Sequence, residues 1–228
     1  MKTKTLIFAL SLIAAATFTT HAADVFVRLN PVPGGSKIRI EGTSSVHDWR
    51  CESSTVGGYA EVGESFPLKP GATVKPGKID AKVSVFVPIR QLKSLKEDGT
   101  PYMEAMDTRM YDSLLEADTK RITYNLTELT LKEAPKSADA PYQFDSKGEL
   151  CVAGVTNKIT MPVMVTVLGE NKVKFAGSTT VKMTDFKIEP PSPAVAFGLI
   201  KTGDDVKIFF EWTAMKKTTN APAVKPAK

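Results

Sequence analysis

Apolar and polar residues alternate through most of the chain, from about Val25 to Trp212, in segments separated by turn residues. An alternation of period two is typical of β-strands that bury one face. The clearest case is the segment 79–87, in which every odd position is apolar and Phe86 is the one apolar residue on the other face. The pattern therefore predicts an all-β domain.

Prolines, glycines and asparagines mark the ends of these segments. Pro31, Pro33 and the pair Gly34-Gly35 predict a turn after the first strand, and Gly169-Glu170-Asn171 predicts a hairpin. The predicted strands cover 25–30, 37–42, 47–52, 56–62, 79–87, 121–131, 142–155, 158–168, 173–186 and 206–214. About eight principal strands are typical of a closed, up-and-down antiparallel barrel, because closure removes the free edges of the sheet.

One stretch, roughly Thr100 to Leu115, has helical spacing instead. Thr100 is a good N-cap and Pro101 a good first helical residue. Met103, Met106 and Met110 recur with Leu114 on one side of such a helix and form an apolar stripe. The sequence thus predicts one amphipathic helix with an adaptable, methionine-rich face.

The first 22 residues resemble an export signal. Lys2 and Lys4 precede the uncharged apolar run Leu6–Phe18, and small residues before Ala22 suit cleavage after it. The run is shorter than the roughly 18 residues expected of a membrane-spanning helix, and no later segment is long and apolar enough. We therefore expect a signal peptide (1–22), a barrel domain (23–215) and a solvated Lys/Pro/Ala tail (216–228), in a protein exported to a bacterial periplasm.

The charge is concentrated in the two ends of the chain. The full sequence has a net charge of +5, but two lysines lie in the leader and four in the tail, with no acidic residue in either, so the domain between them is left at −1. A nucleic-acid-binding domain usually carries a basic stripe on its fold. The sequence shows none, and we expect no nucleic-acid partner.

Cys51 and Cys151 are the only cysteines of the chain. In an oxidising compartment a single disulfide between them is the favoured interpretation, with two separate buried thiols as the alternative. A redox-active pair would more often have the C-x-x-C spacing, which is absent.

The sequence contains no evident catalytic constellation. After cleavage His47 is the only histidine, which excludes sites that need two imidazoles, and no G-x-S-x-G motif is present. A hydrolase that uses His47 with Ser44 or Ser45 is the weakest of the hypotheses. The acidic residues around the end of the helix alternate with basic ones, which is typical of a solvated, ion-paired surface. They are Asp107, Asp112, Glu116 and Asp118. We expect neither an enzyme nor a metal or cofactor site.

A barrel without catalytic residues has its interior as the main candidate site. Inward-facing Val, Ile, Leu, Met and Phe suit an apolar ligand, but small barrels can also be filled by their own side chains. The residues alone leave both possibilities open.

Several motifs spread over the domain carry a family resemblance. They are Gly42-Thr43-Ser44-Ser45-Val46-His47-Asp48-Trp49, the strand Ala81–Ile89, Met106-Asp107-Thr108-Arg109-Met110, Lys120-Arg121-Ile122-Thr123-Tyr124, Gly148-Glu149-Leu150-Cys151-Val152-Ala153-Gly154-Val155-Thr156 and Ile159-Thr160-Met161-Pro162-Val163. In these segments the chain resembles the YceI-like family of periplasmic, lipocalin-like proteins. The resemblance implies an eight-stranded antiparallel β-barrel with one helix near the opening, no enzymatic activity, and a lumen that holds an isoprenoid lipid, polyprenyl or quinone-type.

If the resemblance holds, one face of each strand lines the lumen, and the helix stripe Met103, Met106 and Met110 forms a lid. The predicted lining residues are Val83, Val85, Val87, Ile122, Tyr124, Leu126, Leu150, Val152, Met161, Val163, Val165, Phe175, Phe210 and Trp212. The leading hypothesis is a periplasmic carrier or store of isoprenoid lipid. The alternative is a structural or interaction module of the bacterial envelope with a filled barrel. The oligomeric state is left open, with a dimer among the options.

Overall fold

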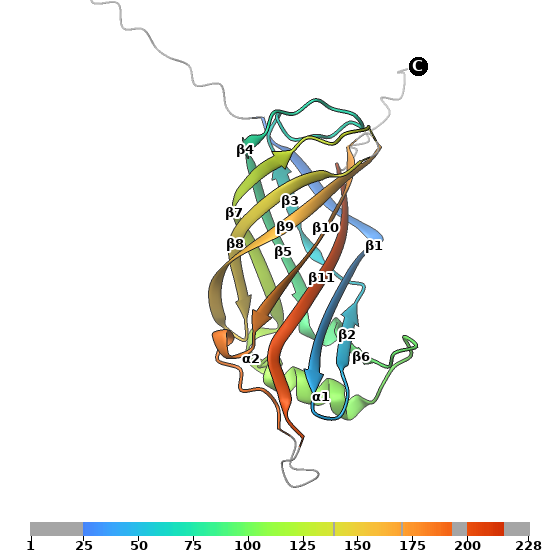
Figure 1. Ribbon diagram of the computed structural model, residues 1–228, viewed down its shortest axis with the longest axis vertical. Coiled ribbons are helices and arrows are strands. Elements are labelled where there is room, and N and C mark those ends of the chain that lie inside the picture. The colour runs from blue at the N-terminus through green and yellow to red at the C-terminus, as the bar shows by residue number, and fades with distance from the viewer. Residues whose placement is uncertain (1–24, 139, 170, 193–199, 217–228) are drawn as a thin grey trace, which may run out of the picture.

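The chain folds into a closed barrel of eight antiparallel strands in a computed structural model that describes residues 25–138, 140–169, 171–192 and 200–216 (Figure 1). The strands of the wall are β1 (Val27–Ser44), β3 (Gly57–Val62), β5 (Ala81–Pro88), β7 (Arg121–Glu133), β8 (Tyr142–Val152), β9 (Val155–Gly169), β10 (Lys172–Lys182) and β11 (Thr202–Lys216). They neighbour one another in this order, and β11 pairs with β1 to close the ring. The predicted fold class is therefore confirmed.

Three short strands supplement the wall. β1 pairs with β3 near its start and with β2 (Trp49–Ser53) from Ile38 to Gly42, and β6 (Lys93–Leu95) pairs with β2. β4 (Gly77–Ile79) pairs with β7. Because β1 exchanges one partner for another along its length, the wall next to it is built from different strands at the two ends of the barrel.

The helices gather at one end, which we call the helix end (Figure 1). It carries α1 (Glu104–Ser113) and α2 (Glu116–Thr119), and the β8–β9 turn lies there too. Two 3₁₀ turns, η1 (Ile89–Gln91) and η2 (Thr184–Phe186), follow β5 and β10. The opposite end carries β4 and the loop 63–76, and we call it the loop end.

The predicted break after residue 30 is wrong, because β1 continues through it. Pro31 lies opposite Ala214 and Ser36 opposite Trp212, so the intervening residues form a bulge. Gly34 adopts a φ of 69° within this bulge. The turn-forming residues interrupt the ladder only locally, since strand pairing with β11 resumes on both sides.

The predicted start of the helix is also wrong. α1 begins at Glu104 with Met103 as its N-cap. Thr100 instead donates its N–H and its hydroxyl to Asp98 Oδ1, at 2.9 and 2.6 Å. Pro101 forms an isolated bridge with Leu95. These contacts belong to a turn in which Gly99 N–H donates to Lys96 O and Lys96 N–H donates to Thr100 O. The turn leads Pro101 back beside Leu95, so the helix cannot begin at Thr100.

The two cysteines are free, so the predicted disulfide is not formed. Cys51 is buried on β2, whereas Cys151 lies on β8 between the buried residues Leu150 and Val152 and therefore faces the other side of the wall. In the sheet order β7, β5, β3 and β1 separate the two strands. A disulfide needs Cα atoms within about 7 Å, which this arrangement does not favour.

The predicted ends of the domain lie largely outside the described residues. The signal peptide 1–22 is not among them, and of the tail 216–228 only Lys216 is, as the last residue of β11. Within the described part of the chain no helix has the length and hydrophobicity to cross a bilayer.

Candidate functional site

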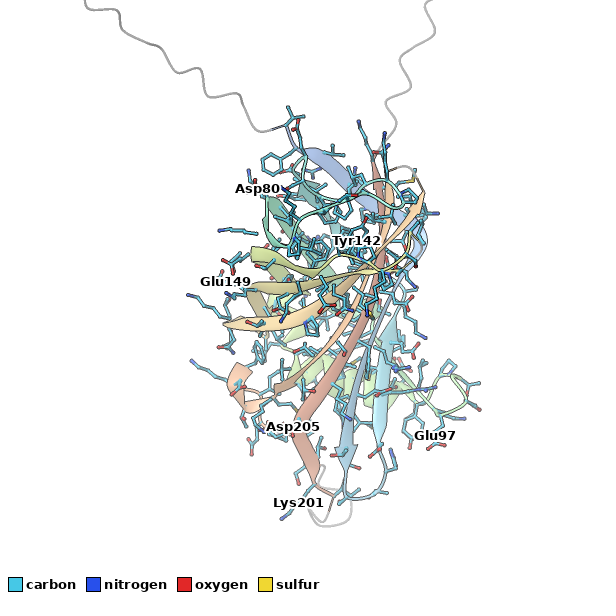
Figure 2. All side chains as sticks on the ribbon, turned by 45° about the horizontal axis from the view of Figure 1, so that its top comes forward. Asp80, Glu97, Tyr142, Glu149, Lys201 and Asp205 are labelled. Carbon is cyan, nitrogen blue, oxygen red and sulfur yellow. The ribbon has the colours of Figure 1, made fainter. Side chains whose placement is uncertain are left out.

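All the predicted lining residues on the strands belong to the core or pack against it. The set runs from Val83, Val85 and Val87 on β5 round the barrel to Phe210 and Trp212 on β11. Strand alternation places them on the inner face. Figure 2 shows the two faces on β8, where Tyr142 lies within the barrel and Glu149 projects from the wall.

The interior near the loop end is filled by aromatic side chains. Phe66, from the loop after β3, lies 5.9 Å from the Phe144 ring and 6.0 Å from the Phe175 ring, and Phe175 lies 5.4 Å from Trp212. Tyr142 is also buried and donates its hydroxyl to Ala72 O at 2.6 Å. We call these five residues the aromatic plug. Phe175 and Trp212, both predicted to line a ligand site, are thus part of a packed core.

From the middle of the barrel to the helix end the interior is different. Here the inward apolar side chains pack against the core but remain partly exposed. They are Ile38, Ile40, Val83, Val85, Ile122, Leu126, Ile159, Val181, Ile208 and Phe210. A side chain that faces inward keeps accessible surface only where a water-sized space adjoins it. This part of the interior, which we call the open half, is therefore less completely buried than the aromatic plug at the loop end.

Sequence reasoning named only some of these residues. It missed Ile38, Ile40, Ile159, Val181 and Ile208, although each continues the alternation of its own strand. The period-two alternation of each strand therefore identifies these residues when it is followed along the whole strand.

Three glycines on the inner face leave room for aromatic rings of neighbouring strands to lie flat against the wall of the open half. A Cβ at Gly42, Gly148 or Gly177 would collide with an aromatic ring of a neighbouring strand. The pairs are Gly42 with Trp49, Gly148 with Tyr124 and Gly177 with Phe210. Each ring lies over the position of a missing side chain, so it occupies wall space and not the middle of the barrel.

One polar pair lies inside the barrel. The hydroxyl oxygens of Tyr124 and Ser146 are 2.7 Å apart and form a buried hydrogen bond. Burial raises the pKa of Tyr124, and the hydrogen bond with Ser146 opposes that effect. The pair satisfies both of its buried polar groups, whereas the buried Nε1 of Trp212 has no hydrogen-bond partner among the described residues.

The inner face of α1 differs from the predicted methionine stripe. Asp107, Tyr111 and Leu114 are its most buried side chains, and Met110 packs against the core. Met103 is the N-cap and 50% exposed, while Met106 is partly buried. Because the helix begins later than predicted and is oriented by polar contacts, only Met110 of the predicted lid contacts the core.

Those polar contacts centre on Asp107. Its Oδ1 accepts hydrogen bonds from the N–H and the hydroxyl of Ser94, both at 2.7 Å, and its Oδ2 lies 3.1 Å from Lys93 Nζ. Burial by itself raises the pKa of Asp107, but the bonds from Ser94 and Lys93 together outweigh it and hold that pKa below its usual value. Tyr111 adds a hydrogen bond to Leu92 O at 2.9 Å. We call Asp107, Ser94, Lys93 and Tyr111 the α1 latch.

A second buried carboxylate holds the next turn. Glu116 lies 2.9 Å from Arg90 Nη2 and 3.6 Å from Lys120 Nζ. The hydrogen bond from Arg90 is the main reason that the pKa of Glu116 is lowered, and Lys120 adds to it. The interpretation of this acidic cluster as a solvated surface is therefore wrong for Asp107 and Glu116, which are 8% and 7% exposed.

A pocket of about 320 Å³ opens beside the end of α1. It is lined by Asp112, Ser113, Leu115, Ala153, Val155, Phe186, Lys187, Ile188 and Glu189. These residues come from the α1–α2 connection, the β8–β9 turn and η2 with the segment after it. We call it the helix-end pocket.

His47 has the contacts of a surface loop residue. It is exposed between β1 and β2, its Nδ1 lies 2.7 Å from Asp48 O, and its ring meets the ring of Tyr102 edge-on at 5.9 Å. The Ser44 hydroxyl bonds the backbone of the same loop, including His47 O at 2.7 Å. Within the described ranges no group of three or more His, Cys, Asp or Glu side chains could hold a metal ion.

The fold and its partly open interior are those of a barrel-shaped binding protein. The YceI-like domain matches residues 35–214, and the chain belongs to this family. BcnA from Burkholderia cenocepacia is similar in structure, with a TM-score of 0.58 at 12% identity over 82% of this chain and 100% of that one. A polyisoprenoid-binding domain from Saccharophagus degradans, implicated in plant cell wall breakdown, is also similar in structure. Its TM-score is 0.57 at 12% identity, over 85% of this chain and 100% of that one. At this low sequence identity, each similarity shows that the solved structure and this chain share a fold. A search of curated proteins found no match.

Proposed function

We propose that this protein is a non-enzymatic periplasmic binding protein that sequesters or carries an isoprenoid lipid, either polyprenyl or quinone-type, in the open half of its barrel. The observation that carries the proposal is the ring of inward apolar side chains that keep accessible surface. An apolar chain in contact with them would gain about 25 cal/mol per Å² of apolar area removed from water.

Two further points support the proposal. The Saccharophagus domain of the same fold is described as polyisoprenoid-binding, and the first 22 residues have the composition of an export signal. The aromatic plug limits the ligand to the part of the barrel nearer α1, so a long chain would lie with one end against the plug and the other toward the helix end.

The test is to express the chain with its own leader, purify it from the periplasm, extract it with organic solvent and identify the extract by mass spectrometry. A stoichiometric isoprenoid supports the proposal. A blank, repeated on protein from the native host, overturns it and favours the filled barrel with a role on its surface.

Two methionines on β9 provide a matched pair of variants. Met161 faces inward and is 8% exposed, whereas Met164 faces outward and is 49% exposed. We expect Met161→Arg to lose the lipid and Met164→Arg to keep it, because a charge is costly to bury beside an apolar chain. Val85→Phe fills the open half without a charge and should also reduce occupancy, which guards against misfolding of Met161→Arg. Equal lipid occupancy in all variants would contradict a ligand in the open half.

A further inference from the structure

Leu115, at the rim of the helix-end pocket, has a conformation that its own residue type does not favour. It follows the C-cap of α1 with φ 50° and ψ 47°, in the left-handed region where glycine or asparagine is usual. Its side chain is 48% exposed. The left-handed turn joins α1 to α2, since Leu115 N–H donates to Asp112 O and Leu115 O accepts from the N–H groups of Asp118 and Thr119. That role does not require a leucine, and the side chain gains no full burial from it.

Two other lining residues share this backbone feature. Ala153 has a φ of 48° and Lys187 a φ of 58°. Of the five non-glycine residues with positive φ in the described part of the chain, these two and Leu115 line the same pocket. The positive φ of Ala153 is explained by its place in the β8–β9 hairpin, and that of Lys187 by its place at the end of η2. Concentrations of such residues are typical of ligand sites.

The floor of the pocket is also a wall of the core. Phe186 lines the pocket, is 2% exposed and belongs to the core cluster, and Val155 and Ile188 line the pocket while packing against that cluster. The pocket and the hydrophobic interior are thus separated by single side chains.

The turn that carries Phe186 is held by a few polar contacts at the surface. Thr184 donates its N–H and hydroxyl to Asp204 at 2.9 and 2.7 Å, and Asn157 Nδ2 donates to Asp185 O at 2.7 Å. All three bonds involve exposed groups, which exchange readily with water. Backbone bonds also hold the turn, since Met183 N–H donates to Asp204 O and the N–H groups of Phe186 and Ile188 donate to Met183 O. An opening at this point therefore requires a rotation of the Phe186 side chain and not a displacement of the turn.

We propose that the helix-end pocket is the portal of the barrel, in which a segment of the lipid chain lies against Leu115, Val155 and Ile188 and passes inward when Phe186 turns aside. The inference rests on the proposed function. The pocket is within the range of about 300–1,000 Å³ usual for ligand sites. Its charged residues, Asp112, Lys187 and Glu189, are of both signs, which favours an apolar chain and not an anionic headgroup.

The test blocks the pocket with a label at a single cysteine. Cys151→Ser leaves only Cys51, which is buried and whose pKa is raised to about 12 by that burial and by Asp107, so it should not react. Leu115→Cys is added for the pocket, and Leu168→Cys is the control. Leu168 is 49% exposed, against 48% for Leu115, and lies near the other end of β9.

Each variant is labelled with a bulky maleimide, and uptake of radiolabelled geranylgeraniol from phosphatidylcholine vesicles is followed. We expect loading to slow by at least ~10-fold with the label at position 115 and to be unchanged with the label at position 168, since a blocked portal limits the rate and not the capacity. Phe186→Leu, which keeps the site apolar but removes the ring, should load faster than the unsubstituted protein.

The outcomes separate the two proposals. If the unsubstituted protein takes up geranylgeraniol and both labelled variants load at similar rates, the portal is overturned and the binding function stands. If the unsubstituted protein takes up none, the binding function is overturned, and the portal with it.

Discussion

The α1 latch should make the stability of the barrel depend on one carboxylate. Asp107→Asn keeps the shape of the side chain but replaces Oδ2, which faces Lys93, with an amide group. The two bonds from Ser94 then lose their charged acceptor, and charged acceptors contribute about 1 kcal/mol more per bond than neutral ones. Lys93 adds little, because its side chain is 56% exposed. We expect Asp107→Asn to lower the free energy of unfolding by about 2 kcal/mol.

A second substitution extends the series. Asp107→Ala removes the acceptor altogether and leaves the N–H and hydroxyl of Ser94 buried without it, so its cost should be larger, about 3 kcal/mol or more. Asp112→Asn is the matched control, since Asp112 is an exposed aspartate on the same helix. A negative charge near the C-terminal end of a helix is slightly unfavourable, so this control should be neutral or weakly stabilising.

The effect should also depend on pH in one direction. The pKa of Asp107 is lower in the folded protein than its ordinary value of about 3.9. Its contribution is therefore fully present above that ordinary value and is lost as the pH falls through the lower, folded-state pKa. Lys93 remains charged throughout this range, and its pKa is raised by hydrogen bonds from its ammonium to Tyr111 and Asp107.

Urea unfolding of the three variants and the unsubstituted protein, at pH 7 and at several values down to about pH 2, measures these differences. The deficit of Asp107→Asn should shrink as the pH falls. A deficit at pH 7 no larger than that of Asp112→Asn, or one that stays constant to the lowest pH, would refute the assignment of Asp107 as the residue that holds α1.

Three further results are expected. A thiol reagent at pH 8 should modify Cys151 but not Cys51 in the folded protein, because burial raises the pKa of Cys51 to about 12. In denaturant without reductant the reagent should modify both cysteines, and fewer than two modified thiols would indicate that a cysteine is held in a disulfide. Gly148→Ala should displace the Tyr124 ring toward the interior, lowering stability by about 1–3 kcal/mol in urea unfolding and reducing lipid capacity; unchanged lipid capacity would contradict the role of the glycine. Phe144→Ala should remove part of the aromatic plug and cost about 3–5 kcal/mol in thermal unfolding; a cost below ~1 kcal/mol would show that the plug is not tightly packed.

The strands and the inner face of the barrel were determined by the sequence alone. Burial alternates residue by residue along β8, and a strand has only two faces, so the pattern assigns its apolar residues to the inner face. The predicted lining residues on the strands all belong to the core or pack against it. The existence of one principal helix was equally predictable, because its spacing differs from that of all the surrounding segments.

Where the prediction failed, distant contacts competed with local signals. Pro31 and Gly34 are strong turn residues, yet pairing with β11 on both sides makes them a bulge. Thr100 is a good N-cap in isolation but bonds Asp98. Cys51 and Cys151 are compatible with a disulfide in any sequence-level argument, and only the strand order places them apart.

The sequence by itself determined that the chain forms an antiparallel barrel with an apolar interior, because the period of the pattern specifies strands and their buried face. Only the tertiary structure decided how that interior is divided. The aromatic plug depends on Phe66 reaching Phe144 and Phe175 from a loop far away in sequence. The open half depends on glycines lying opposite the rings of neighbouring strands. Such relations between strands follow from register, and register is set by the closure of the whole barrel.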